Sequence, residues 1–528
     1  MPDIIDWLPE FKVSAESDRD LMRYFVKTPL VERVLRGGRW MVIGRKGTGK
    51  TAIYEYFRQA TSMELDGHQA IALSFKDYPW PIQRLYRESM ESEISSYQRS
   101  WRYLIIVKCL ASLIEAIEKQ GQLNAELKRA KALLQKLFGR PDPGLLEIVK
   151  SKIFRLKSLN LPGAEIDEAS LTLGGVEFED VAQHEDLQRQ LRANAFQLLE
   201  YFDGIYRRNA HYIKQFVIID QLDENWLHGE IEEYSKILVN LILCAQNINH
   251  STEYSSNLKI VVFLRSDIYE TLRFNDKNKV YQDGAIEIKW DYNSLDEMIT
   301  ERIEKYAPSA MKLDLSERSA SIFEKKTVRH GATPLKHMLR RSFYRPRDLI
   351  VYLNKVREIH KPVASELYTS KDLYAAERTV SSSMYDELID EWAAQNPEFE
   401  SYLLAIQNIG YEIFLRAQFI EKYRAIRPTA SDGEINEILR FLFANSIIGQ
   451  KVSVNWGYVC TSPHIQIDFQ LPFHVNNGLK YRLVLTENRE KRKKKSCCGQ
   501  SRLIFSSSSC PTLQNSVVKR PLRGISLL

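Results

Sequence analysis

The sequence lacks long apolar runs: none of its segments reaches the roughly 18 uninterrupted apolar residues that a membrane-spanning helix needs. Its first residues, MPDIIDWLPEFK, contain neither a basic lead nor an apolar stretch, so we expect no secretory signal. Cysteine is scarce, with six residues in 528, and its spacing with the ten histidines resembles neither a disulfide framework nor a zinc site. These absences exclude an integral membrane protein and a disulfide-rich secreted domain, and they indicate the cytoplasm.

A strong charge of one sign is lacking over most of the chain. The net charge is +6, but residues 486–528 alone hold ten Lys/Arg and two Asp/Glu, so residues 1–485 carry a net charge of −2. A net charge this close to zero over residues 1–485 does not indicate nucleic-acid binding. The basic runs at 128–136 and 489–495 leave contact with a phosphate backbone open as an alternative to a solvated surface. Residues 486–528 also have a serine run and no apolar periodicity, which predicts a disordered tail.

What the sequence does contain is a complete match to G-x-x-x-x-G-K-[ST], within MVIGRKGTGKTAIYEYF at residues 41–57. An apolar run precedes the match and a helical pattern follows it, so the glycines lie between a strand and a helix. In that context backbone N–H groups and the helix N-terminus bind phosphates. The alternative is a helix N-terminus without a ligand. We predict an ATP site made of Gly44, Arg45, Lys46, Gly47, Thr48, Gly49, Lys50, Thr51 and Ala52.

Each of two residues in this loop has a specific predicted task. Lys50 would reach the β- and γ-phosphates, and the Thr51 hydroxyl would bind Mg²⁺. The metal needs a carboxylate as well, and FVIIDQLDE at residues 216–224 is an apolar strand that ends in acidic residues. Asp220 would hold Mg²⁺. Either Asp223 or Glu224 would orient and deprotonate the attacking water.

Two further segments supply arginines. VVFLRSD, at residues 261–267, ends a third apolar run and puts Arg265 at its tip, where it would sense the γ-phosphate or, as an alternative, pair with Asp267. FYRPRDLI, at residues 343–350, leads into a helix with Arg345 and Arg347. An arginine that enters from a lid neutralises charge on a transferred phosphoryl group. The alternative is that these arginines cap nearby acids.

The order of the patterns predicts the organisation of the chain. Apolar strands alternate with helices around the loop, which predicts an α/β fold of the P-loop NTPase kind, with a parallel sheet covered by helices. Near the C-terminus, helices are followed by alternating stretches at 452–460 and 464–473, interpreted as short strands of a winged-helix-like module. We expect an N-terminal lead and the start of the core at 1–79, a large helical insertion at 80–209, the remainder of the core at 210–293, a helical lid at 294–365, the winged-helix-like module at 366–485 and the basic tail at 486–528.

With these residues the chain resembles the AAA+-related P-loop ATPases to which the STAND and KAP proteins belong, over about residues 13–485. Residues 44–51 resemble Walker A, IIDQLDE resembles the Walker B of STAND proteins, FLRSD resembles sensor 1, and RPRDLI resembles the lid helix with a sensor 2 arginine. The resemblance implies these roles for Asp220, Arg265 and Arg347. Gln221 departs from the pattern, because many AAA+ proteins have the catalytic glutamate there, and no repeats follow the core as they do in STAND sensors.

Three functions stay open from the sequence. The resemblance implies an ATP-binding and ATP-hydrolysing cytoplasmic switch, a homo-oligomer that controls an effector or regulatory protein in trans, in bacterial antiphage or stress defence. The alternative is a DNA-engaging AAA+ ATPase of the initiator or loader type, against which the net charge of residues 1–485 argues. A third interpretation is a nucleotide-binding scaffold without turnover. No base-specific motif separates ATP from GTP.

Overall fold

A computed structural model describes residues 3–487, with gaps at residues 77, 88–96, 152, 154–180, 182, 224–230, 255–256, 309–314, 362–365, 394 and 454. The predicted tail therefore lies outside the described residues from residue 488 on, as does Glu224. Within the described ranges, no helix combines the length and the apolar character that crossing a bilayer requires.

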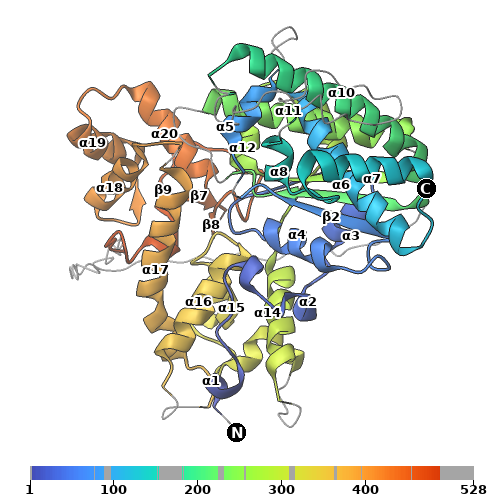
Figure 1. The fold of residues 1–528 in the computed structure, drawn as a ribbon. Coiled ribbons are helices and arrows are strands. Elements are labelled where there is room, and N and C mark those ends of the chain that lie inside the picture. The colour runs from blue at the N-terminus through green and yellow to red at the C-terminus, as the bar shows by residue number, and fades with distance from the viewer. Residues whose placement is uncertain are drawn as a thin grey trace, which may run out of the picture. The chain divides into compact units, whose positions relative to one another are not determined.

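Five strands form a parallel sheet, as their near-continuous runs of Val, Ile and Leu predict. In spatial order they are β2 (His68–Ser74), β3 (Lys214–Asp220), β4 (Leu258–Arg265), β1 (Met41–Gly44) and β5 (Ala285–Glu287) (Figure 1). The register pairs Gly44 with Arg265 and Ser74 with Asp220, so the ends of four strands meet at one edge. This confirms the predicted parallel sheet. It also puts the glycine-rich loop at the C-terminal edge, where open α/β sheets bind ligands.

Both faces of this sheet are covered by helices because successive side chains of a strand point to opposite faces. On one face Val42, Phe216 and Phe263 pack with α3 (Pro29–Arg36) and α4 (Lys50–Gln59). The alternate residues Ile43, Val217 and Val262 belong to a second cluster, which includes the buried sides of α6 (Gln98–Lys119), α10 (Glu185–Asn209) and α11 (Ile231–His250). Of these helices, α4 begins at Lys50 and so starts directly at the glycine-rich loop.

In the region predicted as a helical insertion, the described residues form helices joined by turns and loops. It contains α5 (Trp80–Gln83), η2 (Arg84–Tyr86), α6, α7 (Ala125–Phe138), α8 (Leu145–Val149) and α10, and η5 (Ala210–Tyr212) follows α10. The basic face of α7 is partly neutralised, because the Lys131 ammonium lies 2.5 Å from the Glu118 carboxylate of α6. Between β3 and β5 the chain forms α11, η6 (Thr252–Tyr254), α12 (Ser266–Thr271) and α13 (Lys277–Gly284).

The N-terminal lead connects the helices beyond the sheet with the sheet itself. It contains α1 (Ile4–Trp7), η1 (Ala15–Ser17) and α2 (Leu21–Tyr24). At one end the Phe11 backbone forms two hydrogen bonds with the Asn354 side chain, at 2.9 and 2.8 Å. At the other end the Gln221 amide, at the tip of β3, donates to the Glu16 carboxylate at 2.5 Å. The lead therefore passes across the carboxyl edge of the sheet.

Beyond the sheet, helices and a small second sheet follow. We call α14 (Tyr292–Tyr306), η7 (Leu315–Ile322), η8 (Arg329–Gly331), α15 (Pro334–Leu339) and α16 (Pro346–Ile359) the lid. The long helix α17 (Ser370–Trp392) leads from the lid to α18 (Phe399–Ile409), β6 (Ile413–Phe414), α19 (Arg416–Ile426), α20 (Asp432–Ala444), β7 (Ile448–Val452), β8 (Asn455–Gly457), β9 (Phe473–Val475) and η9 (Asn477–Leu479) (Figure 1). The antiparallel order β6-β9-β7-β8, with three helices before the hairpin, is winged-helix-like, as predicted.

The strands of this winged module are shorter than their alternating sequence predicts. The prediction of a strand at 464–473 is wrong, since only Phe473 of this stretch is in a strand. Ile465, Ile467 and Phe469 do pack against the core. The backbone, however, bonds to a side chain instead of a strand: the buried Gln450 amide donates to the Asp468 carbonyl at 2.6 Å and accepts from the Asp468 N–H at 2.9 Å.

A buried histidine makes the stability of the winged module depend on pH. His474 is 4% exposed, stacks on Trp456 and forms a 2.6 Å hydrogen bond with the Tyr458 hydroxyl. Burial, with help from the nearby Lys480 charge, lowers the pKa of His474 to about 4. The unfolded chain, with a pKa near the ordinary value of about 6.5, binds the proton first as pH falls. We expect the free energy of unfolding to drop by about 3 kcal/mol from this group between pH 7 and pH 4.

Urea unfolding of the chain and of the variant His474→Gln across this pH range measures the effect. Because glutamine does not titrate, the variant should lack this part of the pH dependence. Identical pH profiles for both proteins would refute the assignment.

Candidate nucleotide-binding site

The glycine-rich loop has the backbone that its sequence predicts. Gly47 and Gly49 have φ values of +78° and +96°, a region that favours glycine. At Gly44 a Cβ would lie 2.5 Å from the Thr48 hydroxyl, whose oxygen donates to the Arg45 carbonyl at 2.8 Å. The loop thus turns tightly into the N-terminus of α4, where the helix dipole and free N–H groups favour an anion.

Lys50 lies inside this turn. The residue is partly buried, and its ammonium donates to the carbonyl oxygens of Gly44 at 2.9 Å and Arg45 at 3.1 Å. Burial lowers the pKa of Lys50, and the charges of Asp223 and Asp220 oppose this shift. A desolvated cation held beside the free N–H groups of a helix start is suited to a phosphate group.

Asp220 ends β3 next to this cation. It is 2% exposed, and burial raises its pKa to about 6, although hydrogen bonds from the Gln221 backbone and the Thr51 hydroxyl act in the opposite direction. One carboxylate oxygen, Oδ2, has no hydrogen-bond partner among the described residues. A buried oxygen without a partner beside a hydroxyl fits Mg²⁺, which takes one or two protein ligands and completes its shell with phosphates and water. Within the described ranges, no cluster of three or more His, Cys, Asp or Glu side chains offers a site built from protein ligands alone.

Lys50 and Asp220 line one cavity of about 660 Å³, a volume in the range of small-molecule sites. The cavity is bordered by the loop, the tips of β3 and β4, the lead and the lid. Of the nine predicted ATP-binding residues, six line it and three do not: Lys46, Gly47, Gly49, Lys50, Thr51 and Ala52 line it, whereas Gly44, Arg45 and Thr48 shape or brace the loop. Asp223, Arg265 and Arg347 also border it.

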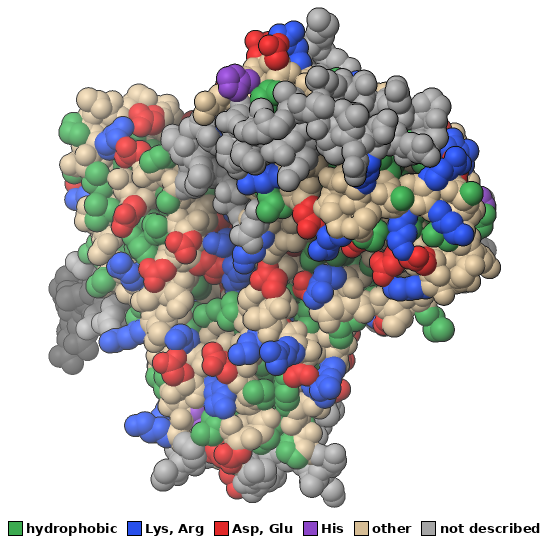
Figure 2. Space-filling model, in the orientation of Figure 1, with side chains coloured by type: hydrophobic (Ala, Val, Ile, Leu, Met, Phe, Trp, Pro, Cys, Tyr) green, Lys and Arg blue, Asp and Glu red, His purple; other side chains and the backbone are tan. Residues whose placement is uncertain are grey.

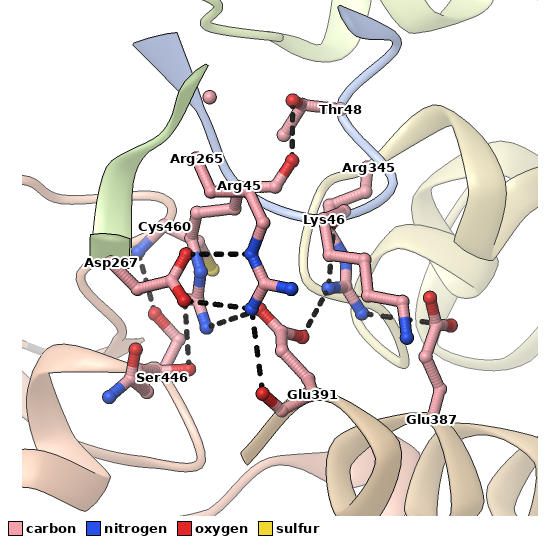
Figure 3. Close-up of polar contacts among 12 residues, drawn as sticks. Arg45, Lys46, Thr48, Arg265, Asp267, Arg345, Glu387, Glu391, Ser446 and Cys460 are labelled. Atoms are coloured by element: carbon pink, nitrogen blue, oxygen red, sulfur yellow. Dashed lines mark hydrogen bonds and ion pairs between the residues drawn. The ribbon is translucent and has the colours of Figure 1, made fainter. Parts of the chain in front are cut away.

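Two of the predicted catalytic residues contact each other. Arg265 forms ion pairs with Asp267 at 2.7 Å and with Asp223 at 3.4 Å (Figure 3 shows the first). The alternative pairing with Asp267 is therefore observed, and Arg265 also borders the cavity, so contact with a γ-phosphate stays a prediction. One carboxylate oxygen of Asp223 is engaged in this pair, and Glu224, the other candidate base, lies outside the described residues.

Gln221, where the sequence departs from the AAA+ pattern, has a left-handed backbone, with φ +63°. Its side chain is held on both sides: it donates to Glu16 and accepts from the Ser74 hydroxyl. Sequence reasoning missed Glu16. No local pattern connects it with a residue 205 positions later.

The lid arginines contact the loop, and Arg347 also borders the cavity. Arg345 is 2% exposed and donates to the Lys46 carbonyl at 3.1 Å, and its guanidinium pairs with Asp348 at 3.1 Å. The Arg347 backbone N–H lies 3.4 Å from the Gly47 carbonyl oxygen, and its side chain pairs with Glu387 at 2.9 Å. A Cβ on Gly47 would come within 3.2 Å of the Arg347 Cβ, so the lid would have to move by a few tenths of an ångström to admit a side chain there.

Glu391, at the end of α17, joins these groups. Its carboxylate is buried and pairs with Arg345 at 3.1 Å and with Arg45 of the loop at 3.6 Å (Figure 3). Its backbone carbonyl accepts from Arg265 at 3.4 Å. Arg45 also donates to the Asn445 carbonyl, at the end of α20, at 3.3 Å. Sequence reasoning missed Glu391, whose surroundings in the sequence, DELIDEWAA, read as an ordinary acidic helix.

Comparisons with known proteins add the following. Residues 293–389, which include α14 to α17, match the family described as FunZ-associated C-terminal helical domain. A protein of Escherichia coli (strain K12), described as putative transposon gamma-delta 80.3 kDa protein, is 21% identical over 459 residues. The match covers 84% of this chain but only 60% of that relative.

Solved structures of low sequence identity are similar over most of the chain. They include the Aeropyrum pernix ORC2 protein in ADPNP and ADP complexes (12% identity, 89% of this chain and 96% of that one, TM-score 0.39). The Aeropyrum pernix ORC1 protein in complex with DNA (12%, 90% and 94%, TM-score 0.34) and Cdc6p from Pyrobaculum aerophilum (10%, 91% and 95%, TM-score 0.27) are further examples. All three TM-scores are below 0.5, so these similarities support no conclusion about what this chain binds. The chain's own sheet, loop and cavity establish a P-loop NTPase fold with a lid and a winged module.

Proposed function

We propose that the chain is an AAA+-related ATPase that binds ATP with Mg²⁺ and hydrolyses it. The state of the bound nucleotide then controls the conformation of the winged module. One observation carries the proposal: the glycine-rich loop borders the cavity with its inner side and contacts the lid and α17 with its outer side. A ligand that rearranges this loop changes the contacts on both sides. The cavity supports the ATPase part, and the outer contacts support the switch.

The residues have distinct roles in the proposed reaction. Lys50 and the N-terminus of α4 hold the phosphates, and Thr51 with Asp220 would hold Mg²⁺, which neutralises charge on the phosphates when it is bound. Asp223, released from Arg265, or else Glu224, orients the attacking water and accepts its proton. Arg347 borders the cavity from the lid and stabilises the charge that develops on the transferred group.

The switch follows from what Arg265 and Glu391 contact. Arg265 now pairs with two carboxylates and the Glu391 carbonyl. A γ-phosphate beside it competes for the same guanidinium donors, so the ATP and ADP states differ in how firmly the end of α17 is held. A ligand shifts a conformational equilibrium only by such a difference in contacts.

The experiment that tests the ATPase is a measurement of phosphate release from ATP and, separately, GTP by the purified chain with Mg²⁺. We expect release that depends on Mg²⁺. Size analysis with and without ATP tests the proposed homo-oligomer. Binding of ATP without release would contradict hydrolysis and favour the scaffold interpretation.

Of the two biological roles weighed from the sequence, the DNA-engaging one has more support. The relative that matches 84% of this chain is named for a transposon, and a winged-helix-like module follows the core. None of the names reported above points to antiphage defence or to an effector protein. We therefore propose a DNA-engaging ATPase as the more specific role, with control of a partner protein as the weaker alternative.

The surface of the winged module makes this role testable. The helix α20 is the last of the three helices and directly precedes the hairpin. Its exposed side carries Asp432, Glu434 and Glu437. Arg416 and Arg424 of the neighbouring α19 pair with Asp432. Figure 2 shows Lys/Arg and Asp/Glu side chains interspersed over the face in view. Arg440 is exposed on the same helix and pairs with Glu437. Because acids outnumber cations on α20, docking of this helix in a major groove is not favoured, and we expect DNA to meet another surface.

We expect duplex DNA binding that requires ATP and weakens with salt, with a slope of about −0.9 per phosphate contacted in a log–log plot. The control is a chain that ends at Glu487, the last residue of the compact unit that contains the sheet, lid and winged module. Binding that disappears in this shorter chain would assign DNA contact to the basic residues beyond it and contradict a role for the winged module.

A further inference from the structure

One buried arginine in the cavity has almost no partners. Arg302, on α14 of the lid, is 7% exposed and borders the cavity. Its guanidinium makes one hydrogen bond, to the Met298 carbonyl at 2.9 Å, and lies over the Tyr24 ring at 4.5 Å. Its Nε has no hydrogen-bond partner, and no carboxylate of the described residues lies within ion-pair distance of it. Buried arginines are normally paired, because desolvation of an unpaired charge is costly.

The nearby acids have other partners. The Asp18 carboxylate bonds with the Tyr24 hydroxyl and accepts from the Asp20 N–H at 3.2 Å. The Asp20 carboxylate accepts from the Tyr306 hydroxyl at 3.0 Å and pairs with Arg23 at 2.9 Å. Burial lowers the pKa of Arg302, and its interactions with the Tyr24 hydroxyl and the Asp18 carboxylate only partly oppose this shift. The guanidinium therefore keeps donors for an acceptor that the described part of the chain does not supply.

The position of Arg302 along α14 indicates which part of a nucleotide it meets. The Trp290 indole N–H, just before α14, donates to the Thr48 carbonyl of the loop at 2.8 Å, so the helix starts at the loop. Ser294, Met298 and Arg302 follow at intervals of four and all border the cavity. Eight residues of helix put Arg302 about 12 Å beyond Ser294. That is the end of the cavity away from the phosphate-binding loop.

The walls beside Arg302 are mostly apolar, and the one carboxylate among them, Asp18, bonds with the Tyr24 hydroxyl. Leu21, Tyr24, Phe25 and Met298 border the cavity there, and Phe25 is fixed by a stacked contact with Tyr56, with ring centroids 4.5 Å apart. An apolar slot with a single strong donor suits a flat heteroaromatic ring that carries acceptor nitrogens at its edge. A phosphate group at this end of the cavity would be surrounded by these side chains on most sides and would lose its hydration, which is unfavourable.

We propose that Arg302 donates a hydrogen bond to an acceptor atom on the base of the nucleotide whose phosphates lie in the glycine-rich loop. The inference rests on the proposed nucleotide binding and adds to it a residue that recognises the base. Arg302 thereby raises affinity for the whole nucleotide without contacting its phosphates.

The test compares ATP with inorganic tripolyphosphate, which has the phosphates but no base. Titrations use the full chain, the variants Arg302→Met and Arg302→Lys, and the reference variant Lys50→Ala. Arg302→Met should weaken ATP binding about tenfold or more, as expected for loss of a hydrogen bond to a charged donor, and leave tripolyphosphate binding unchanged. Arg302→Lys, which keeps the charge but loses the planar fork, should weaken ATP less and serves if the methionine variant does not fold.

Each outcome decides the matter. ATP affinity that is unchanged in Arg302→Met, or in Arg302→Lys if only that variant folds, overturns the inference. A parallel loss of ATP and tripolyphosphate affinity overturns it as well, because the residue would then act on the phosphates or on the fold. If the unaltered chain binds neither compound, the proposed nucleotide binding itself fails. If it binds both and only the base effect is absent, the proposed function stands without this inference.

Discussion

Replacing Lys50 by alanine is expected to lower the rate of ATP hydrolysis by about 100- to 1,000-fold, the cost of removing one preorganised donor from charge that develops in a transition state. The ammonium lies against the loop carbonyls and burial lowers its pKa, so its charge acts at short range in a partly desolvated site. The same change should weaken ATP binding, because the lysine also contacts the ground-state phosphates. Steady-state phosphate release together with ATP titration measures both effects.

The matched control for this prediction is Lys119→Ala. Lys119 is an exposed lysine of α6 that pairs only with Glu115 among the described residues, so its loss should change neither turnover nor ATP affinity. Turnover that is equal in the Lys50 variant and the unaltered chain would remove the basis for the catalytic assignment, and with it the proposed ATPase.

The second large effect is expected at Glu391. Replacing it by glutamine keeps the shape but removes the charge that two buried or half-buried arginines share, Arg45 and Arg345. Loss of one partner from a buried ionic contact costs about 3 to 5 kcal/mol, because the remaining charges stay desolvated. We expect the free energy of unfolding to fall by this amount and the contact between loop and α17 to loosen. Urea unfolding gives the first quantity, and limited proteolysis of the chain reports the second.

Glu387 supplies the comparison, since it lies one turn earlier on α17, pairs at 2.9 Å with the partly exposed Arg347 and contacts the buried Arg345 only at 3.9 Å. Glu387→Gln should cost less, because water screens a more exposed pair. A double-mutant cycle of Arg45→Gln with Glu391→Gln measures the contact itself, and we expect the double variant to lose less stability than the sum of the single variants. Additive losses would show that Arg45 and Glu391 do not interact.

The loop and the strands could be predicted because their signals are local. The spacing from Gly44 to Thr51 fixes a phosphate-binding turn within eight residues, and apolar runs mark β3 and β4 without knowledge of the partners. The same local reasoning failed at 464–473, where alternation indicates a strand but the Gln450 side chain takes the backbone hydrogen bonds. The alternation of apolar and polar residues is the same whether a strand or a side chain supplies the hydrogen bonds, so the sequence pattern cannot distinguish the two.

The residues that reasoning from the sequence missed share a different property. Glu16, Arg302 and Glu391 matter through partners that lie far away in the chain: Gln221 for Glu16, the cavity for Arg302, and Arg45 for Glu391. Their own surroundings in the sequence are helical segments with ordinary charges. Only the fold shows that a carboxylate is buried against the loop or that a guanidinium has no partner. The contact of Arg265 with Asp267, two residues apart, was local and was foreseen as an alternative.

The closeness of the lid to Gly47 has a consequence for energetics. The same few backbone atoms border the cavity and touch α16, so a change on one side is felt on the other. Any coupling between two binding sites is reciprocal. If ATP changes the affinity of the winged module for its ligand by some factor, that ligand changes the affinity for ATP by the same factor. A ligand of the winged module can therefore be detected, without being labelled, through the concentration of ATP at which the chain is half saturated.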